Sequence, residues 1–321
     1  MGRRARDIAV QALALLLVVG VIVYLADNAY TNMARRKIAG GFAFLANPAG
    51  FGVPMTLIPF GEGSTYGRAF VVALLNTALV SVVGIIAATI LGFTIGVARL
   101  SKNWLIARLA GAYVEIVRNI PLLLQIFVWY LAVLRALPPP RQSLSLFGAM
   151  FLNNRGIFLP TLSLPDFAWE LPVLRGFNFT GGISIIPEFA ALGLALSIYT
   201  AAFIAENVRS GILSVRRGQM EAALALGLSY GQTLRLVVIP QALRVIIPPL
   251  TGQYLNLIKN SSLGAAIAYP ELVALFGGTV LNQTGQAIEV IAITMATYLA
   301  ISLAISAAMN RYNRRIARVE R

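Results

Sequence analysis

The sequence predicts an all-α integral membrane protein with six transmembrane helices. Of its 321 residues, 58% are apolar and only 12% are charged, and the mean hydropathy is +0.77. Soluble domains carry about 25% charged residues, roughly twice the fraction found here. Six apolar runs also approach the length of about 20 residues that a helix needs to cross a hydrocarbon core.

These six runs follow one another along the whole chain. The fourth and fifth are the shortest and extend into polar flanks, so their ends are the hardest to predict. The runs span 8–26, 70–98, 120–137, 189–205, 243–258 and 287–308.

The first run has features of a secretory signal as well as of a membrane anchor. Arg3, Arg4 and Arg6 precede it, and small residues lie near its end at Ala26 and Ala29. Its apolar stretch is longer than the core of a signal peptide. We therefore expect it to remain in the protein as a transmembrane helix.

Lys and Arg indicate the orientation, because basic residues accumulate in short cytoplasmic loops. Placing both termini in the cytoplasm puts 17 of the 26 basic residues in inside segments. The outside cluster Arg35, Arg36 and Lys37 opposes this topology, but the reverse topology would expel the charged loop 213–240. The net charge of +14 fits anionic membrane lipid and no nucleic acid, since these arginines flank apolar runs without interleaved aromatic residues.

The runs divide the chain into five parts. The outside insertion is rich in Gly, Pro, Phe and Asn, and we expect it to form a structured cap. It either faces an external binding protein as a lid or packs against neighbouring helix ends. The parts are an N-terminal transmembrane helix with an outside segment (1–66), the first two core helices (67–137), the outside insertion (138–187), the remaining core helices with the cytoplasmic loop 213–240 (188–311) and a basic tail (312–321).

The second run carries Gly84, Gly92 and Gly96. These glycines predict a packed helix face, because small residues let membrane helices approach closely. Near the outer end of the same run, Asn76 is a candidate to line a path through the membrane. Hydrogen bonding between helices explains this side chain equally well.

Charged pairs lie near the cytoplasmic ends of the third and fourth runs. Glu115 and Arg118 are three residues apart, as are Glu206 and Arg209, so each pair can meet on one helix face. They form either a charged gate or surface pairs that anchor helix ends. Gln125 is embedded in the apolar sequence of the third run, where a polar side chain needs a buried partner or a path.

Lys259 lies at the outer end of the fifth run and is followed by Asn260, Ser261 and Ser262. A lysine at a membrane boundary either extends its ammonium group to the lipid headgroups or faces a wet path. Both readings stay open for Lys259.

The segment from Gly218 to Pro240 reads GQMEAALALGLSYGQTLRLVVIP and separates two apolar runs. Residues 219–226 are good helix formers, the glycines that follow supply a break, and Pro240 ends the second piece. We predict two short helices joined by a bend, which can dock on a partner. The candidate docking residues are Glu221, Ala222, Ala223, Gly227 and Pro240.

Several chemistries are missing from the sequence. Cysteine and histidine are absent, which removes disulfides, thiolate nucleophiles, imidazole bases and the usual zinc ligands. No G-x-x-x-x-G-K-[ST] run is present that could cradle nucleotide phosphates. We expect no cofactor, no metal and no catalytic residue, and any ATP hydrolysis must belong to another subunit.

The segment 218–240 resembles the EAA loop of ABC importer permeases, in which Glu-Ala-Ala is followed by three residues, Gly, nine residues and Ile-x-Leu-Pro. Val237 and Ile239 replace the Ile and Leu of that pattern. The motifs ExxRxxPxxxQ, AENVRSGI and LIKNSSL occur in the order seen in permeases of polar amino acid importers, over roughly 66–311. The first run, IPFGEGSTYGRAF and LPPPRQSLSLFGAMFLNNRGIFLP are similar to the larger permease subunit of bacterial general L-amino-acid uptake systems.

This resemblance implies a type I ABC importer core of five helices plus one N-terminal helix, in the bacterial inner membrane. It implies a second homologous permease subunit, an ATPase subunit dimer below and a periplasmic amino-acid-binding protein above. L-amino acids would pass from periplasm to cytoplasm, with Ala222, Ala223 and Gly227 seated in the ATPase cleft and Glu221 facing a basic partner. The substrates and the chain that binds them stay open.

An ATP-independent secondary transporter or channel is the alternative reading. Coupling to protons or ions calls for ionisable residues deep within several spans, and the centres of these runs are almost free of them.

Overall fold

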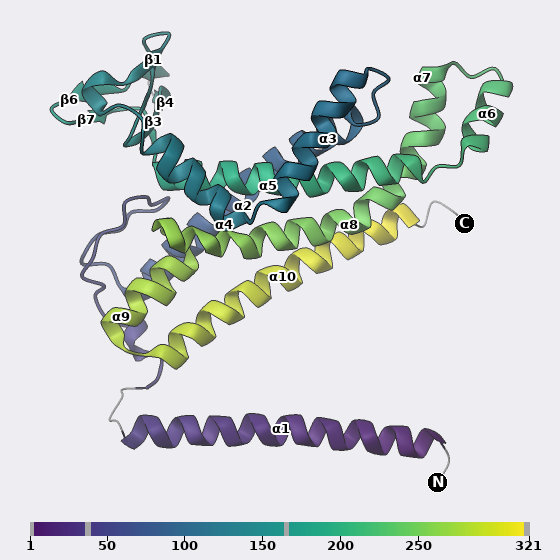
Figure 1. Ribbon diagram of the computed structural model, residues 1–321. Coiled ribbons are helices and arrows are strands. Elements are labelled where there is room, and N and C mark those ends of the chain that lie inside the picture. Colours follow the sequence, from purple (N-terminus) through teal and green to yellow (C-terminus); the bar gives the residue numbers. More distant parts are fainter. Residues whose placement is uncertain (1–2, 36–39, 164–166, 318–321) are drawn as a thin grey trace.

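The computed structural model describes residues 3–35, 40–163 and 167–317, and it is dominated by long helices (Figure 1). They are α1 (Arg3–Arg35), α2 (Tyr66–Ala98), α3 (Trp104–Asn119), α4 (Leu122–Phe127), α5 (Pro187–Leu213), α6 (Arg217–Ala225), α7 (Tyr230–Thr233), α8 (Ile239–Asn260), α9 (Leu281–Thr284) and α10 (Ala287–Ala317). Short 3-10 or π-helical pieces extend or join them. These are η1 (Phe42–Ala46), η2 (Val128–Leu134), η3 (Pro140–Gln142), η4 (Leu234–Val238), η5 (Ser261–Ile267) and η6 (Val273–Val280).

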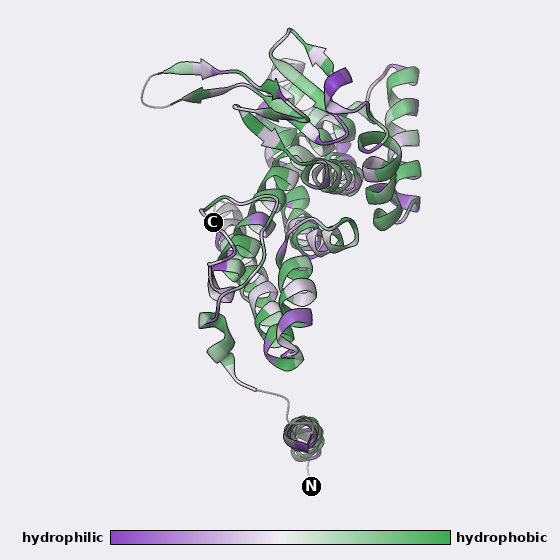
Figure 2. Ribbon diagram, turned by 90° about the vertical axis from the view of Figure 1, so that its left-hand side faces the viewer, coloured by the Kyte–Doolittle hydropathy of each residue, from purple (hydrophilic) through white to green (hydrophobic). Residues whose placement is uncertain are grey.

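The helices have the length and composition of membrane spans. Among the described residues, five helices are long and apolar enough to cross a membrane, or up to six if the bent pair α3–α4 counts as one span. Figure 2 shows that apolar residues dominate the helices, and many of their large apolar side chains are exposed, as lipid contact requires. The predicted all-α membrane fold is therefore confirmed.

α2 and α5 form the centre of the bundle and run in the same direction. A Cβ atom at Gly92 would lie 2.6 Å from Ile204 Cβ, and one at Gly96 would lie 2.7 Å from Val208 Cβ. Only glycine leaves room for this approach, so a larger residue would push the two helices apart. The packed face predicted from these glycines is confirmed.

The third predicted run is one arm of a bent pair. α3 and α4 with η2 meet at an angle of 104° around Pro121. Pro121 has no N–H to donate to the preceding turn, which is why the helix breaks there. The run 120–137 corresponds to α4 and η2 alone, and α3 adds an amphipathic helix before the bend.

A single helical run extends from the loop into the bundle. α7, η4, α8 and η5 follow without a gap from Tyr230 to Ile267. Pro240 is the second residue of α8, so the prediction that it ends the helix is wrong. The wider π-helical turn η4 stands directly before it and makes room for a ring that would otherwise meet the carbonyl of the preceding turn.

After η5 the chain turns at Ala268, whose φ is +58°, and continues through η6 and α9. α10 then runs back along the bundle (Figure 1). The amino end of α1, the carboxyl end of α10 and the pair α6–α7 lie at one end of the molecule, and the strands lie at the other (Figure 1).

The insertion between η2 and α5 folds into short strands that the sequence did not lead us to expect. Four form an antiparallel sheet in the order β1-β2-β3-β8, and two hairpins, β4-β5 and β6-β7, complete the cap. Phe179 fastens one hairpin to the sheet, because its ring stacks 4.6 Å from Phe151 and 4.9 Å from Phe158. The strands are β1 (Leu144–Leu146), β2 (Met150–Asn153), β3 (Gly156–Leu159), β4 (Thr161–Ser163), β5 (Ala168–Glu170), β6 (Val173–Arg175), β7 (Asn178–Thr180) and β8 (Ile183–Ile185).

α1 lies apart from the bundle in both views (Figures 1 and 2). None of its apolar window from Arg6 to Leu25 is buried. The chain reaches the bundle only after α1, where Phe44 of η1 is buried beside Tyr66 and Ala69 of α2.

Candidate functional site

The loop formed by α6 and α7 is built from two complementary helix ends. Gly227 has a φ of +86°, and its N–H donates to Leu224 O while Leu228 N–H donates to Ala223 O. These two bonds form a Schellman motif, which closes α6 and requires the left-handed conformation that glycine adopts most easily. A Cβ at Gly227 would meet nothing within 4 Å, so the glycine is needed for its backbone and not for space.

α7 begins two residues later with a capping box. The Ser229 hydroxyl accepts from Gln232 N–H, and the Gln232 side chain accepts from Ser229 N–H. Both orphan donors at this helix start are thereby satisfied. The bend from α6 to α7 is thus held by hydrogen bonds within the loop itself.

The two predicted alanines of this loop point in different directions. Ala223 is 5% exposed and lies inside the loop, where Thr233 and Val238 are also buried. Ala222 and Glu221 are exposed. Ala223 therefore holds the loop together, and Ala222 and Glu221 are the members that a partner can reach.

Five exposed apolar side chains of the loop escaped the sequence reasoning. These residues are 42 to 84% exposed, although they lie on a charged segment at the end of the molecule. We call them the outer loop face. In the sequence, the only hint of these exposed residues is that apolar residues recur both before and after the Gly227 bend. They are Leu224, Leu226, Tyr230, Leu236 and Ile239.

The loop connects to the centre of the bundle through a close contact between α8 and α5. A Cβ at Gly211 would lie 2.3 Å from Ile246 Cγ1 and 3.3 Å from Ala242 O. The contact lies close to the loop, because Gly211 is near the end of α5 and Ala242 and Ile246 are near the start of α8. Any displacement of the start of α8 is therefore passed to the end of α5 by direct packing.

Glu206 joins two helices, α2 and α5, at the same end of the bundle. Its carboxylate accepts from the Arg209 guanidinium at 2.7 Å, as predicted, and also from Arg99 at the end of α2. Arg99 was missed because it lies far from Glu206 in the sequence. The three side chains are 15 to 33% exposed, so the cluster ties α2 to α5 while it keeps contact with the surface.

The other predicted pair does not form. Glu115 is exposed, and the Arg118 guanidinium lies over the Phe203 ring of α5, 4.9 Å from its centroid. This cation–π contact fixes Arg118 between α3 and α5 instead of on the face of its own helix.

Asn76 and Gln125 are buried and bonded to backbone carbonyls. Asn76 is fully buried, and its Nδ2 donates to Met55 O at 2.9 Å and to Pro270 O at 3.0 Å. Gln125 donates from Nε2 to Val117 O and Ile120 O, two carbonyls that the bend after α3 leaves without helical partners. These bonds favour a structural role for both side chains over a place in an open path.

Asn76 belongs to a buried cluster that holds the turn after η5. Thr77 Oγ1 accepts from Leu272 N–H at 3.1 Å, and the Tyr269 hydroxyl donates to Asn76 O at 2.9 Å. The buried Glu271 carboxylate accepts from Val273 N–H, Ala274 N–H and the Tyr298 hydroxyl of α10. We call these groups the outer turn cluster, and they join α2, the turn and α10.

One face of α8 remains open along its length. Its exposed residues recur every three or four positions and grow polar toward the outer end, where Asn256 and Lys259 lie. Lys259 is in the last turn, where a cation interacts favourably with the helix dipole. Asn256 was not predicted as a site residue, because the sequence alone does not distinguish an exposed asparagine from a buried one. The face consists of Val245, Pro249, Gly252, Asn256 and Lys259.

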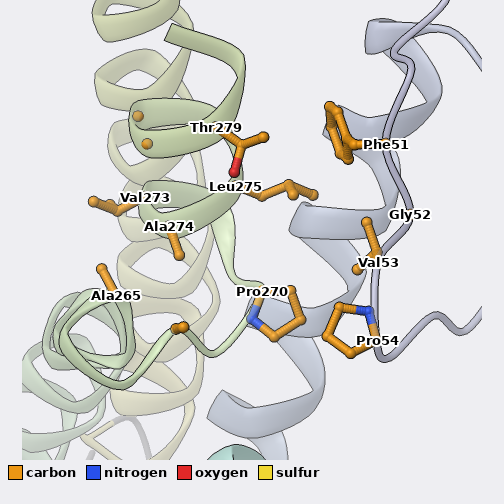
Figure 3. Close-up of a pocket in the computed structure, with 13 residues that line it drawn as sticks. Phe51, Gly52, Val53, Pro54, Ala265, Pro270, Val273, Ala274, Leu275 and Thr279 are labelled. Atoms are coloured by element: carbon orange, nitrogen blue, oxygen red, sulfur yellow. The ribbon is translucent and has the colours of Figure 1, made fainter. Parts of the chain in front are cut away.

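A pocket of about 440 Å³ lies between the extended segment after η1 and the pieces η5 and η6 (Figure 3). Phe51 and Pro54 lie on one side, and Pro270, Leu275 and Thr279 lie on the other (Figure 3). Its lining has no charged side chain. It therefore offers no side-chain charge to pair with an ionic ligand, and none of the predicted site residues lines it.

Comparison with known proteins places this geometry in a family. Residues 84–318 match the model of the binding-protein-dependent transport system inner membrane component. The chain is 52% identical to the amino-acid ABC transporter permease protein YhdX of Escherichia coli (strain K12), over 97% of this chain and 94% of that protein. It is 46% identical to the general L-amino acid transport system permease protein AapQ of Rhizobium johnstonii, over 98% and 93%.

Two solved structures share the fold. A crystal structure of an amino acid ABC transporter with histidines aligns with a TM-score of 0.58 at 24% identity, over 78% of this chain and 95% of that chain. The inward-facing MetNI methionine ABC transporter aligns with a TM-score of 0.52 at 21% identity, over 78% and 97%. The resemblance inferred from the sequence is thus confirmed, and the chain belongs to the family of binding-protein-dependent transport system inner membrane components.

Proposed function

We propose that this chain is the permease subunit of an ABC importer that moves L-amino acids from the periplasm to the cytoplasm. The observation that carries the proposal is the loop α6–α7, a pre-formed bend with an exposed apolar face that continues directly into α8. The names of YhdX and AapQ support amino acids as the substrate class. ATP hydrolysis then belongs to an ATPase dimer on which the loop docks.

The placement of charge and elements supports the orientation. The ends of α1 and α10 lie at the same end of the molecule as the loop (Figure 1), and both carry arginines. Basic residues favour the cytoplasmic side, so both termini are cytoplasmic in this proposal. The strand cap then faces the periplasm, where a soluble amino-acid-binding protein would deliver its cargo.

The open face of α8 supports a second, homologous permease subunit. Asn256 and Lys259 are exposed on a helix that is otherwise apolar enough to cross a membrane. Polar groups are costly against lipid, so such a face normally meets a partner or a water-filled path. A translocation path between two permease chains, lined on this side by α8, would give the Asn256 amide and the Lys259 ammonium group a polar environment.

The mechanism follows from packing. The outer loop face and Glu221 seat in a cleft of the ATPase, and closure of the ATPase dimer moves the loop. Because α7, η4 and α8 are one helical run and Gly211 locks α8 against α5, that movement reaches the lining of the path. In this proposal the Glu206 cluster, which ties α2 to α5 at the loop end of the bundle, acts as a gate that breaks and re-forms as the two helices move.

ATP-driven amino-acid uptake tests this proposal in proteoliposomes that hold the co-purified complex. Gly227→Asp strains the bend and Glu221→Lys reverses the exposed charge, so both should abolish coupled uptake while the permease remains folded. Gly50→Asp is the matched control, since Gly50 is equally open and also has a positive φ, +69°, but lies in the segment before α2. Full uptake in both loop variants would overturn the proposal.

A further inference from the structure

α10 presents an open face of unusual regularity. Alanine recurs there at every fourth residue, and only 11% of the apolar window of α10 is buried. Each step of four residues turns by about 40°, so three successive alanines share one side of the helix. Small residues in such a row let a second membrane helix approach closely. The row, called here the alanine row, consists of the exposed residues Ala292, Ala296 and Ala300, and Ala304 and Ala308 continue the spacing toward the other side of α10.

α1 is a membrane-length helix that lacks a packing partner along its described apolar window. Residues 6–25 are fully apolar except near the start, and none of that window is buried. Ala9, Ala12 and Gly20 fall within one sector of this helix when each residue turns by about 100°. α1 therefore also has one side on which small residues gather.

The chain itself keeps the carboxyl end of α1 near the amino end of α10. Gly41 N–H donates to the buried Glu289 carboxylate at 2.6 Å, and Glu289 lies in the first turn of α10. Since the segment between Arg35 and Gly41 spans at most about 20 Å, the end of α1 stays close to the start of α10. The two helices run in opposite directions (Figure 1), as a hairpin requires.

We propose that in the membrane α1 packs antiparallel against α10, with the alanine row and the Gly20 side of α1 as the contact. The packing continues an interface that already exists between Gly41 and Glu289. The tether gives α1 a high effective concentration at this face before any other helix can reach it. Aligning the centres of the two apolar windows places Gly20 level with Ala296, within about one helical turn.

Disulfide trapping tests this contact, and the chain has no cysteine of its own to interfere. A Gly20→Cys, Ala296→Cys double variant is oxidised in membranes and analysed by gel mobility and peptide mass. We expect an intrachain disulfide in most molecules. Ile22→Cys with Ala296→Cys is the matched control, since Ile22 lies at nearly the same depth on the opposite side of α1, and its yield should be several-fold lower.

The other outcomes contradict the proposal. A disulfide between two chains from Ala296→Cys alone would mean that the alanine row receives the helix of a neighbouring subunit. No disulfide from either pair would leave the row facing lipid. Co-purification of the reduced variants with their partner subunits checks that the substitutions have not unfolded the chain, and none of these outcomes depends on which substrate is transported.

Discussion

The two ends of the bundle are held together by different forces. At the outer end, buried hydrogen bonds of Asn76, Thr77 and Glu271 fix the turn after η5. At the inner end, Glu206 holds two arginines near the surface, and the loop beyond it leaves its apolar face open. The outer end is built to stay in one conformation, and the inner end is built to receive a partner.

Among the substitutions that test this contrast, Glu271→Ala should cause the largest loss of folding free energy. The substitution leaves the N–H groups of Val273 and Ala274 without their acceptor inside the protein, which should cost about 2–4 kcal/mol of folding free energy. Thermal unfolding of the purified chain measures the loss. Glu62→Ala, which removes an exposed carboxylate, should leave the unfolding temperature unchanged. Equal stability of the two variants would show that the outer turn cluster is not a structural anchor.

A somewhat smaller effect is expected from Asn76→Ala. The carbonyls of Met55 and Pro270 lose their donor in a buried place, at a cost of about 1–3 kcal/mol. Asn282→Ala removes an exposed amide and serves as the control in the same unfolding assay. If Asn76→Ala instead keeps its stability and loses uptake, Asn76 belongs to the translocation path after all.

Gly227→Ala probes the inner end through the backbone. Alanine at a φ of +86° costs about 1–2 kcal/mol, because its Cβ approaches the neighbouring carbonyl. Gly218→Ala, at the second residue of α6, should instead stabilise that helix, by less than about 0.5 kcal/mol because the position lies in the first turn. Hydrogen exchange of the α6 amides should therefore speed up in the first variant and slow down in the second. A change of the exchange rate in the same direction in both variants would contradict the Schellman assignment.

The smallest effect on stability should come from Glu206→Gln. Its ion pairs are partly exposed and screened by solvent, so their loss should cost less than about 1 kcal/mol. The stability that remains should depend less on salt than that of the native chain. Unfolding in low and high salt checks this, and a large loss that is independent of salt would place Glu206 in the same class as Glu271.

The same contrast explains what could be read from the sequence. The loop could be predicted from the sequence because Gly227 and the helix formers before it determine the backbone conformation of their own segment. The role of Arg99 could not be predicted, since its pairing with Glu206 depends on how α2 packs against α5. Asn76 and Gln125 were recognised as polar residues in apolar runs, but the sequence cannot distinguish a backbone carbonyl partner from a wet path.

The remaining differences also have local causes. The cap strands are only three or four residues long, too short for a clear alternation of apolar and polar residues. Pro240 normally signals a helix end, yet here the π-helical turn before it accommodates the ring. In both cases the outcome was set by backbone geometry that residue types alone do not record.

The uninterrupted helical run from Tyr230 to Ile267 gives the molecule a lever. It contains 38 residues and joins the loop to the turn after η5. Its far end is held by the outer turn cluster, so a push on the loop would turn the run about that anchored end. A small rotation imposed in the cytoplasm would thereby move the inner part of α8 while its outer end stays in place, and so would open or close a passage near the cytoplasmic side of the membrane.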